Sequence, residues 1–175
     1  MNNTKDLLVT PRLVLRHFNY NDASEMFLNW ASDIEVTKYV TWDPHQSVEE
    51  TKTIINMWMK EYEDSNTHRF AITLKSSGEL IGGIDVVEYE DGHPVIGYVL
   101  SRKYWNQGYM TEACKEFVDY LLSLGYKTLV IEAVDQNIGS NRVISKCGFS
   151  YIGSDIRENK NELVTVYRYQ LNRGK

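Results

Sequence analysis

The stretch "VIGYVLSRKYWNQGYMTEACKEFVDYLL", residues 95–122, joins three patterns that together indicate the fold. It begins with a strand-like apolar run and continues through a polar turn that contains Gly108. It ends in a segment whose apolar side chains recur every three or four residues, which is typical of a helix with one buried face. A glycine-bearing turn between a strand and a helix exposes backbone N–H groups at the positive end of the helix. We therefore expect this turn to bind an anion, usually a phosphate.

The patterns on either side of this stretch predict the remaining elements. The expected strands, in chain order, span residues 12–18, 69–74, 79–87, 95–100, 128–134 and 163–171. The expected helices begin at Asn21 or Asp22, at Ser47, after Gly108 and within residues 139–149. An antiparallel meander that passes into a βαβ crossover predicts an α/β fold, with a mixed sheet and helices on both faces.

Length and composition indicate one soluble globular domain over residues 1–175, since domains usually hold about 100–200 residues. The net charge of −5 gives no electrostatic support for a nucleic-acid partner. Residues 1–16 lack the long apolar core of a signal peptide or a membrane span. We therefore expect no membrane partner and a cytoplasmic location.

The spacing of cysteines and histidines predicts no metal site. Cys114 and Cys147 lie far apart and form no CxxC pair, and none of the four histidines stands at a ligand spacing from them. Without a disulfide framework, free thiols in a reducing cytosol are expected.

A second polar cluster, "NIGSNRVISKCGF" at residues 137–149, follows the next expected strand. As local structure, Asn137 and Ser140 can cap a helix that Gly148 ends. An asparagine at the end of a strand can also offer its amide to the polar arm of a ligand between two strands. The two interpretations do not exclude each other.

These two clusters, with "TPRLVLR" at 10–16, "GELIGGI" at 78–84 and "REN" at 157–159, resemble the GCN5-related N-acetyltransferase (GNAT) superfamily. The closer likeness is to its branch of ribosomal-protein N-terminal acetyltransferases, and it covers nearly the whole chain. The resemblance implies a GNAT-like, mostly antiparallel sheet with a central βαβ crossover. It also implies acetyl-CoA as cosubstrate and an amine acceptor, either a peptide N-terminus or a small molecule. A homodimer is a further expected partner.

The resemblance also assigns cofactor contacts to individual residues. The pyrophosphate of coenzyme A would lie on the N–H groups of the turn, where Gly108 lets the backbone approach closely. The pantetheine arm would pair with Val99 and Leu100 like an added strand, with Asn137 on its other side. The complete expected set is Val99, Leu100, Trp105, Asn106, Gln107, Gly108, Tyr109, Met110, Thr111, Asn137 and Asn141.

The chain departs from the superfamily pattern Q/R-x-x-G-x-G/A, because Trp105 and Met110 stand at its first and last places. Both substitutions look like variants of the ribosomal-type branch. Ile144 stands where many members carry a tyrosine that protonates the departing thiolate, and the resemblance to the ribosomal-type branch points instead to Ser140. Glu158, or a water chain, is the expected base.

A second function stays open at this level, because related sequences often have a glutamate where this chain has Val95. A chain without its base and its tyrosine would be a non-catalytic acyl-CoA-binding module of the same fold. In either case the acceptor site is expected within residues 21–62. Tyr39, Trp42 and Trp58 are the candidates to line it, although such aromatics are more often core.

Overall fold

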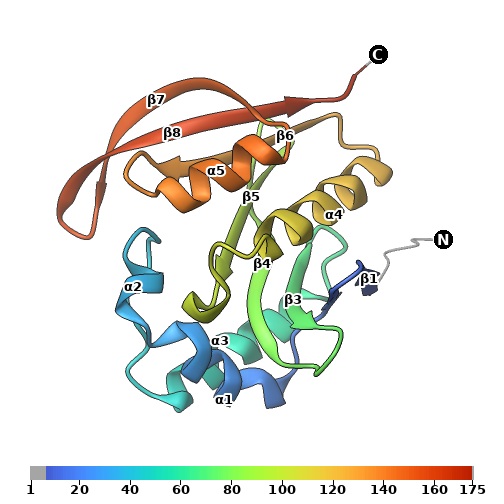
Figure 1. The fold of residues 1–175 in the computed structure, drawn as a ribbon, viewed down its shortest axis with the longest axis vertical. Coiled ribbons are helices and arrows are strands. Elements are labelled where there is room, and N and C mark those ends of the chain that lie inside the picture. Colours follow the sequence, from blue (N-terminus) through green and yellow to red (C-terminus); the bar gives the residue numbers. More distant parts are fainter. Residues whose placement is uncertain (1–6, 175) are drawn as a thin grey trace.

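One eight-stranded sheet runs through residues 7–174, the part of the chain that the computed structural model describes (Figure 1). The strands follow one another in the order β1-β2-β3-β4-β5-β6-β8-β7. Only β5 and β6 are parallel neighbours, and the mixed, mostly antiparallel sheet expected from the sequence is confirmed. The strands are β1 (Leu7–Val9), β2 (Leu13–Arg16), β3 (Arg69–Leu74), β4 (Leu80–Glu90), β5 (His93–Leu100), β6 (Thr128–Val134), β7 (Ser150–Asn159) and β8 (Glu162–Asn172).

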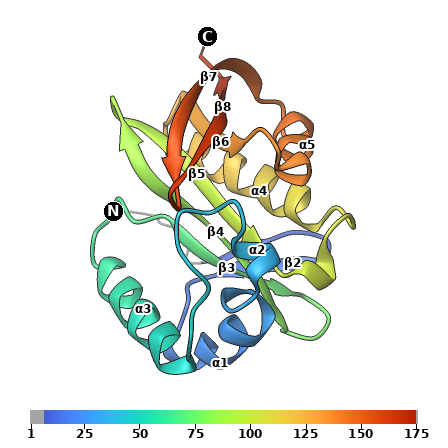
Figure 2. The ribbon, with the colours of Figure 1, turned by 90° about the vertical axis from the view of Figure 1, so that its left-hand side faces the viewer.

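Helices cover both faces of the sheet, as expected (Figure 2). The buried side chains of α4 and α5 belong to one core cluster, and those of α1, α2 and α3 belong to the other. The helices are α1 (Ala23–Met26), α2 (Ile34–Thr37), α3 (Val48–Glu61), α4 (Tyr109–Ser123) and α5 (Ile138–Lys146), with short turns η1 (Tyr20–Asp22), η2 (Phe27–Ala31) and η3 (Arg102–Tyr104).

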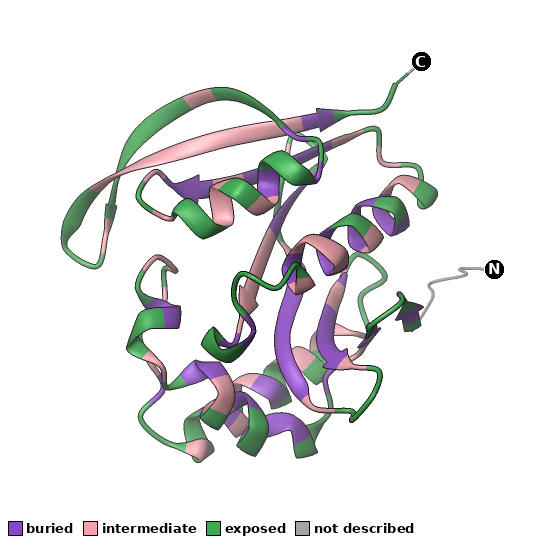
Figure 3. Cartoon of the chain, viewed as in Figure 1, coloured by how far each residue is buried: buried purple, intermediate pink, exposed green. Residues whose placement is uncertain are grey.

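The two core clusters follow from the period-two alternation of the central strands. In β3, Phe70 and Ile72 belong to the cluster under α4 and α5, whereas Ala71 between them belongs to the cluster under the N-terminal helices. On the α4 side the Phe70 and Phe117 rings meet edge to face, with centroids 6.0 Å apart. Figure 3 shows the result, with the middle strands buried and much of β7 exposed.

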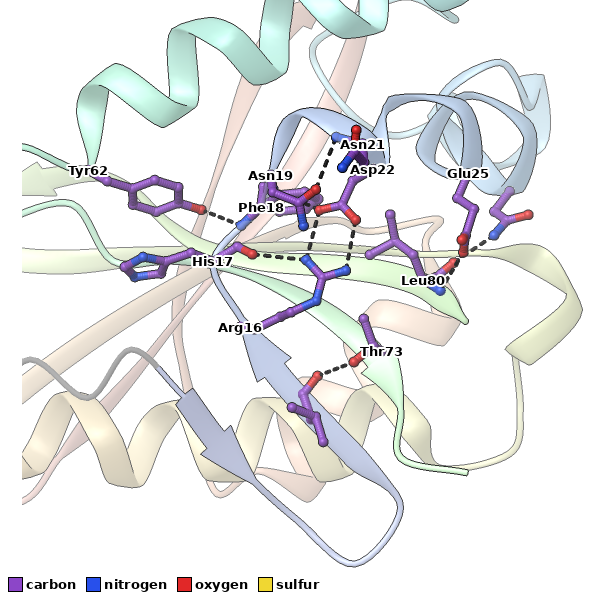
Figure 4. Close-up of polar contacts among 12 residues, drawn as sticks. Arg16, His17, Phe18, Asn19, Asn21, Asp22, Glu25, Tyr62, Thr73 and Leu80 are labelled. Carbon is purple, nitrogen blue, oxygen red and sulfur yellow. Dashed lines mark hydrogen bonds and ion pairs between the residues drawn. The ribbon is translucent and has the colours of Figure 1, made fainter. Parts of the chain in front are cut away.

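The N-terminal helices are tied to the sheet by polar contacts at the end of β2 (Figure 4). Arg16 binds both carboxylate oxygens of Asp22, at 2.8 and 2.7 Å. The hydroxyl of Tyr62 accepts a hydrogen bond from Phe18 N and donates one to Arg69 O, both at 3.0 Å. Burial raises the pKa of Tyr62 to about 12, so this hydroxyl keeps its proton. These contacts fix where α3 stands above the sheet.

α1 begins directly after Asp22, one of the two residues expected to cap it, but the Asp22 side chain makes no capping hydrogen bond there. The side-chain cap lies earlier, where Asn19 accepts from Asn21 N and opens the short turn η1. The carboxylate of Asp22 reaches back to Asn19 N at 2.8 Å, and Glu25 accepts from Leu80 N on β4 instead of closing a capping box.

The cap at Ser47 is confirmed, since its hydroxyl accepts from Glu50 N at 3.2 Å. The carboxylate of Glu50 then accepts from Gln46 N at 2.7 Å. This helix, α3, carries Ile55 in its buried face. These two contacts tie the end of the preceding loop to the first turn of α3.

The sequence patterns did not predict two of the strands, β1 and β7. β1 has only three residues, and β7 is an edge strand whose side chains are mostly exposed. β7 is held by its antiparallel partner β8 and by a tight turn in which Lys160 and Asn161 both have positive φ. Neither strand shows the alternation of apolar and polar residues that marks a half-buried strand.

The N-terminal expectation concerns residues 1–16, of which 1–6 lie outside the described residues. Over residues 7–174, no helix has the length and apolar character to cross a membrane. Cys114 and Cys147 are both free and buried. In the same part of the chain, no group of three or more His, Cys, Asp or Glu side chains could hold a metal ion.

Replacing Gly82 by alanine tests the register of β4 against β5. A Cβ at this position would lie 2.3 Å from Val99 O, so the two strands must move apart. We expect Gly82→Ala to lower the free energy of unfolding by about 1–3 kcal/mol in urea denaturation. Gly139→Ala is the control, because its Cβ meets nothing closer than 3.9 Å and lies within α5. This variant should be more stable by about 0.5–1 kcal/mol. Equal stability of both variants would contradict the register.

Candidate functional site

A gap opens in the middle of the sheet where β5 and β6 part. The two strands pair only at Val95 with Val130 and at Ile96 with Ile131. Residues 97–100 continue β5 with a partner on the β4 side alone. The backbone of this segment therefore borders an opening between two parallel strands.

The alternation of the β4–β5 ladder decides which backbone groups face that gap. Ser101 N donates to Ile81 O at 2.7 Å, so this directly opposed pair is hydrogen-bonded. In an antiparallel ladder every second residue repeats that pattern, which turns the backbone groups of Val99 toward β4. Those of Tyr98 and Leu100 face the gap instead. The indole Nε1 of Trp105 already donates to Leu100 O, at 2.8 Å, which agrees with this direction.

The turn after η3 leaves the N-terminus of α4 uncapped. Gly108 is the N-cap residue, with φ of +80°, and no side chain caps the helix. Glu112 N donates to Gly108 O at 3.0 Å and is the first amide of α4 with a helical partner. Within residues 7–174, the N–H groups of Gly108, Tyr109, Met110 and Thr111 find no acceptor. Such amides at a positive helix end suit an anion.

A salt bridge braces this turn from the opposite end of the chain. Glu112 accepts from Thr10 Oγ1 at 2.6 Å and from Arg12 Nε at 2.7 Å. Arg12 Nη1 also donates to Gln107 O at 3.1 Å, and its guanidinium lies 4.0 Å from the centre of the Tyr109 ring. Burial opposes the ionised form of Glu112, but the hydrogen bonds from Thr10 and Arg12 outweigh it and lower its pKa. The brace holds the turn and places a cation beside Gly108.

On α5 the cap is Asn137 alone, whose Oδ1 accepts from Ser140 N at 3.2 Å. The expectation that Ser140 also caps this helix was wrong. Its hydroxyl lies 2.8 Å from the Tyr98 hydroxyl, which also donates to Ser140 O at 3.2 Å. Burial raises the pKa of Tyr98, and the hydrogen bond with Ser140 only partly offsets this. Tyr98 therefore stays neutral and holds Ser140 in place.

Asn141, expected as a cofactor contact, uses its whole side chain inside the protein. Its Nδ2 donates to Val134 O at 3.0 Å and to Asn137 O at 2.8 Å. Its Oδ1 accepts from the hydroxyl of Tyr169 at 2.6 Å. These contacts fix the loop between β6 and α5, so the structure favours a positioning role. Direct contact with a cofactor stays a prediction.

A cavity of about 720 Å³ lies between the gap and the N-terminal helices. Four of the expected site residues line it, namely Val99, Asn137, Ser140 and Glu158. Leu100, the turn from Trp105 to Thr111, and Asn141 are outside its lining. The aromatic candidates Tyr39, Trp42 and Trp58 all line it, together with Phe18 and Trp30.

Two arginines in the cavity wall are held by carboxylates that sequence patterns did not single out. Arg69 binds Asp85 at 3.0 Å and also Glu61. Burial raises the pKa of Asp85, and the guanidinium of Arg69 opposes that effect. Arg157 binds Glu132 at 2.6 Å. These pairs join different elements at separations of 8, 16 and 25 residues, so no local motif reveals them.

Comparison with known proteins gives one family. Residues 12–150 match the model of the acetyltransferase (GNAT) domain. An uncharacterized N-acetyltransferase, p20 of Bacillus licheniformis, is 31% identical over 171 residues, which cover 95% of this chain and 96% of the relative.

Solved structures share the fold over nearly the whole chain. A GNAT-family acetyltransferase from Bacillus anthracis superposes with a TM-score of 0.82 and 25% identity, over 95% of this chain and 98% of that one. RimL, a ribosomal L7/L12 alpha-N-protein acetyltransferase in complex with coenzyme A, gives a TM-score of 0.82 at 18% identity. That alignment covers 95% of this chain and 97% of RimL.

The role of Asn141 can be tested by its bond to Tyr169. Asn141→Ala leaves several buried polar groups unpaired and should lower the free energy of unfolding by about 1–3 kcal/mol. Tyr169→Phe removes one hydrogen bond and should cost about 0.5–1.5 kcal/mol. Urea denaturation of both variants and of the double variant should give a coupling energy of at least about 0.5 kcal/mol. Strictly additive effects would contradict the contact.

Proposed function

The chain belongs to the GNAT acetyltransferase family, and we propose that it moves an acetyl group from acetyl-CoA to a primary amine. The observation that carries this proposal is the succession of two backbone features along one segment. β5 borders the gap, and the turn after it ends in the four unpaired amides of α4. The gap suits an arm that carries amides and the turn suits a pyrophosphate, and coenzyme A contains both.

The residues at the turn fit the phosphates of this cosubstrate. Gly108 adopts a left-handed conformation and presents no Cβ, so the backbone can approach an anion closely. Arg12, whose Nη2 lies 3.4 Å from where that Cβ would stand, adds a positive charge. The presence of coenzyme A in RimL, a protein of the same fold, supports this assignment.

Coenzyme A carries the acetyl group as a thioester, and its transfer forms a C–N bond and breaks a C–S bond. The amine must lose one proton, and the departing thiolate gains one. We assign delivery of a proton to sulfur to Ser140, and removal of the amine proton to Glu158, directly or through water. Both side chains line the same cavity. Each assigned group would then enhance the rate by the factor typical of general acid–base catalysis, about 10²–10⁴-fold.

Tyr98 controls which way the proton of Ser140 points. Its single proton can serve either the carbonyl oxygen or the hydroxyl oxygen of Ser140. When Tyr98 donates to the hydroxyl oxygen, the proton of Ser140 is free for a group in the cavity. Tyr98 is therefore a positioning residue in this proposal.

The acceptor is a protein N-terminus or a small-molecule amine, within a single acetyltransferase domain of residues 1–175. The N-acetyltransferase relative p20 and the ribosomal enzyme RimL both support an amine acceptor. The homodimer stays a prediction. β7, with the exposed side chains of Ile152 and Ile156 at the edge of the sheet, is the surface at which to look for it.

Coenzyme A should stabilise the protein, and Gly108→Val should remove that effect. At about 100 times its dissociation constant the ligand adds about 2.7 kcal/mol to the free energy of unfolding. A valine at Gly108 blocks the approach of phosphate. Gly78→Val is the matched control, since Gly78 has φ of +76° and open space around its Cβ. Both variants suffer the same backbone strain, but only Gly108→Val should lose the thermal shift. A retained shift in Gly108→Val would place the phosphates elsewhere.

Ser140→Ala should separate chemistry from binding and from stability. Loss of a general acid should lower turnover by about 10²–10⁴-fold while the KM for acetyl-CoA barely changes. Ser145→Ala, an exposed serine on the same helix, is the control and should retain full turnover. Single-turnover acetyl transfer, followed by thiol release, measures both variants. Near-normal transfer by Ser140→Ala excludes the acid role, and no transfer by the unaltered protein favours the acyl-CoA-binding module.

A further inference from the structure

We propose that β7 is the interface of a homodimer. In this dimer β7 pairs antiparallel with β7 of a second copy of the chain, and Ile156 faces its own counterpart. β7 is the last strand in the sheet order, and Figure 1 shows it as the outer strand of the hairpin that it forms with β8. An edge strand presents unpaired N–H and C=O groups, which another strand can bind. The inference goes beyond acetyl transfer and does not depend on it.

The two edges of the sheet differ in how well they are blocked against such pairing. β1, at the opposite edge, has only three residues. β7 has ten residues without proline or lysine, and its β-bulge lies near its start, where the register shifts between Tyr151 and Gly153. Ile152 is 50% exposed and Ile156 is 73% exposed. A long edge strand that carries exposed isoleucines and few blocking residues is typical of a strand that pairs with another chain.

The hairpin turn decides which backbone groups of β7 point outward. Residues 160 and 161 form a two-residue turn, and both have positive φ, as in the type I′ turn of a tight hairpin. The residues that flank such a turn form a hydrogen-bonded pair, so Asn159 and, at intervals of two, Arg157 and Asp155 bond to β8. Ile156 therefore turns its N–H and C=O away from β8. Over residues 7–174, no loop, turn or cap pairs with these two groups.

Charge selects one register for the pairing. In an antiparallel pair about a two-fold axis, the residue at the axis faces its own counterpart. An axis at Asp155, Arg157 or Glu158 would place like charges opposite each other, which is destabilising. An axis at Ser154 would bring the β-bulge into the pairing. With the axis at Ile156, Asp155 faces Arg157 of the second copy, and the symmetry repeats this pair. This register gives two pairs of opposite charge and packs two isoleucines against each other.

The side chains of Asp155 and Arg157 are available for these contacts. They lie on the same face of β7, where Arg157 binds Glu132 through Nη1 at 2.6 Å and Nη2 at 2.9 Å. The side chain of Asp155 is 65% exposed and reaches Arg157 only at 3.3 Å. Over residues 7–174, Nε of Arg157 has no acceptor. Because Arg157 lines the cavity, a carboxylate of the second copy would stand beside the cavity wall.

The hairpin is held at its tip, so its edge has a fixed course before any pairing. Lys160 Nζ donates to Thr37 O at 2.7 Å, and Asn159 Nδ2 donates to Val40 O at 3.4 Å. These contacts bind the tip to the end of α2 and to the residues that follow it. A strand that is already ordered loses less conformational entropy when it binds a partner.

Sedimentation velocity of the full chain over a concentration series tests the dimer. We expect a species with twice the mass of one chain. Asp155→Arg turns both pairs of opposite charge into like-charge pairs and should raise the Kd of the dimer by about 10-fold or more. Asp119→Arg is the control, since Asp119 is exposed on α4 and undergoes the same change of charge. This control should keep the dimer.

Three results of this experiment would overturn the proposal. The first is an unaltered protein that stays monomeric at every concentration, which would leave the edge to a different partner. The second is an unchanged Kd in Asp155→Arg. The third is an equal loss of affinity in Asp155→Arg and Asp119→Arg.

Single cysteines test the register. In the proposed dimer, the Cα atoms at Ile156 and its counterpart are about 5.5 Å apart, within the range of a disulfide. With diamide as the oxidant, which takes up the two electrons and two protons of the thiols, Ile156→Cys should form a covalent dimer on a non-reducing gel. Ser154→Cys is the control, because its two copies are four residues out of register, about 13 Å apart. The unaltered protein should form no covalent dimer, since Cys114 and Cys147 are buried. Equal cross-linking of the two variants, or none by Ile156→Cys, would exclude the register.

Discussion

The structure depends on a break in a β-sheet. Buried backbone N–H and C=O groups must be paired, and strands in the middle of a sheet normally satisfy each other on both sides. Here β5 pairs with β6 over two residue pairs, and the pairing then ends. The remaining groups of β5 at Tyr98 and Leu100 are left for another partner, and Trp105 has already taken one of them. A ligand that brings its own amides can complete the sheet, and for this reason we place the candidate site at this gap.

The elements on either side of that gap are fixed by polar contacts, and one of them supplies unpaired amides. α4 must cross from β5 to β6, so its uncapped N-terminus falls at the end of the segment that borders the gap. Glu112 and Arg12 brace the turn, because four amides pointing at open space would otherwise favour rearrangement. On the far side, Asn141 ties the start of α5 to β6 and β8. The two braces come from different ends of the chain, while the amides of residues 108–111 stay without an acceptor over residues 7–174.

The sequence predicts well what local periodicity controls. β3 and β6 have the bounds expected from their apolar runs, and the turn at Gly108 carries the glycine and the helix that its motif requires. Sequence patterns fail where a contact joins distant positions. The β1–β2 turn meets Glu112 across 100 residues, and Tyr98 meets Ser140 across 42. The strand β7 was not predicted for another reason, because an exposed edge strand lacks the alternation of apolar and polar residues that burial imposes.

The charge of the cavity sets two demands that oppose each other. Carboxylates near an ammonium group favour its charged form, but only the neutral amine attacks a thioester. A cavity lined by carboxylates must therefore still deprotonate the attacking amine, and this requires a base near the gap. Over residues 7–174, no cation of the protein pairs with the carboxylate of Glu158. Burial raises the pKa of Tyr98, so the group that contacts the Ser140 hydroxyl is a neutral phenol. In the proposed function, Glu158 would take the proton of the amine, and Ser140, held by this neutral phenol, would deliver a proton to the thiolate.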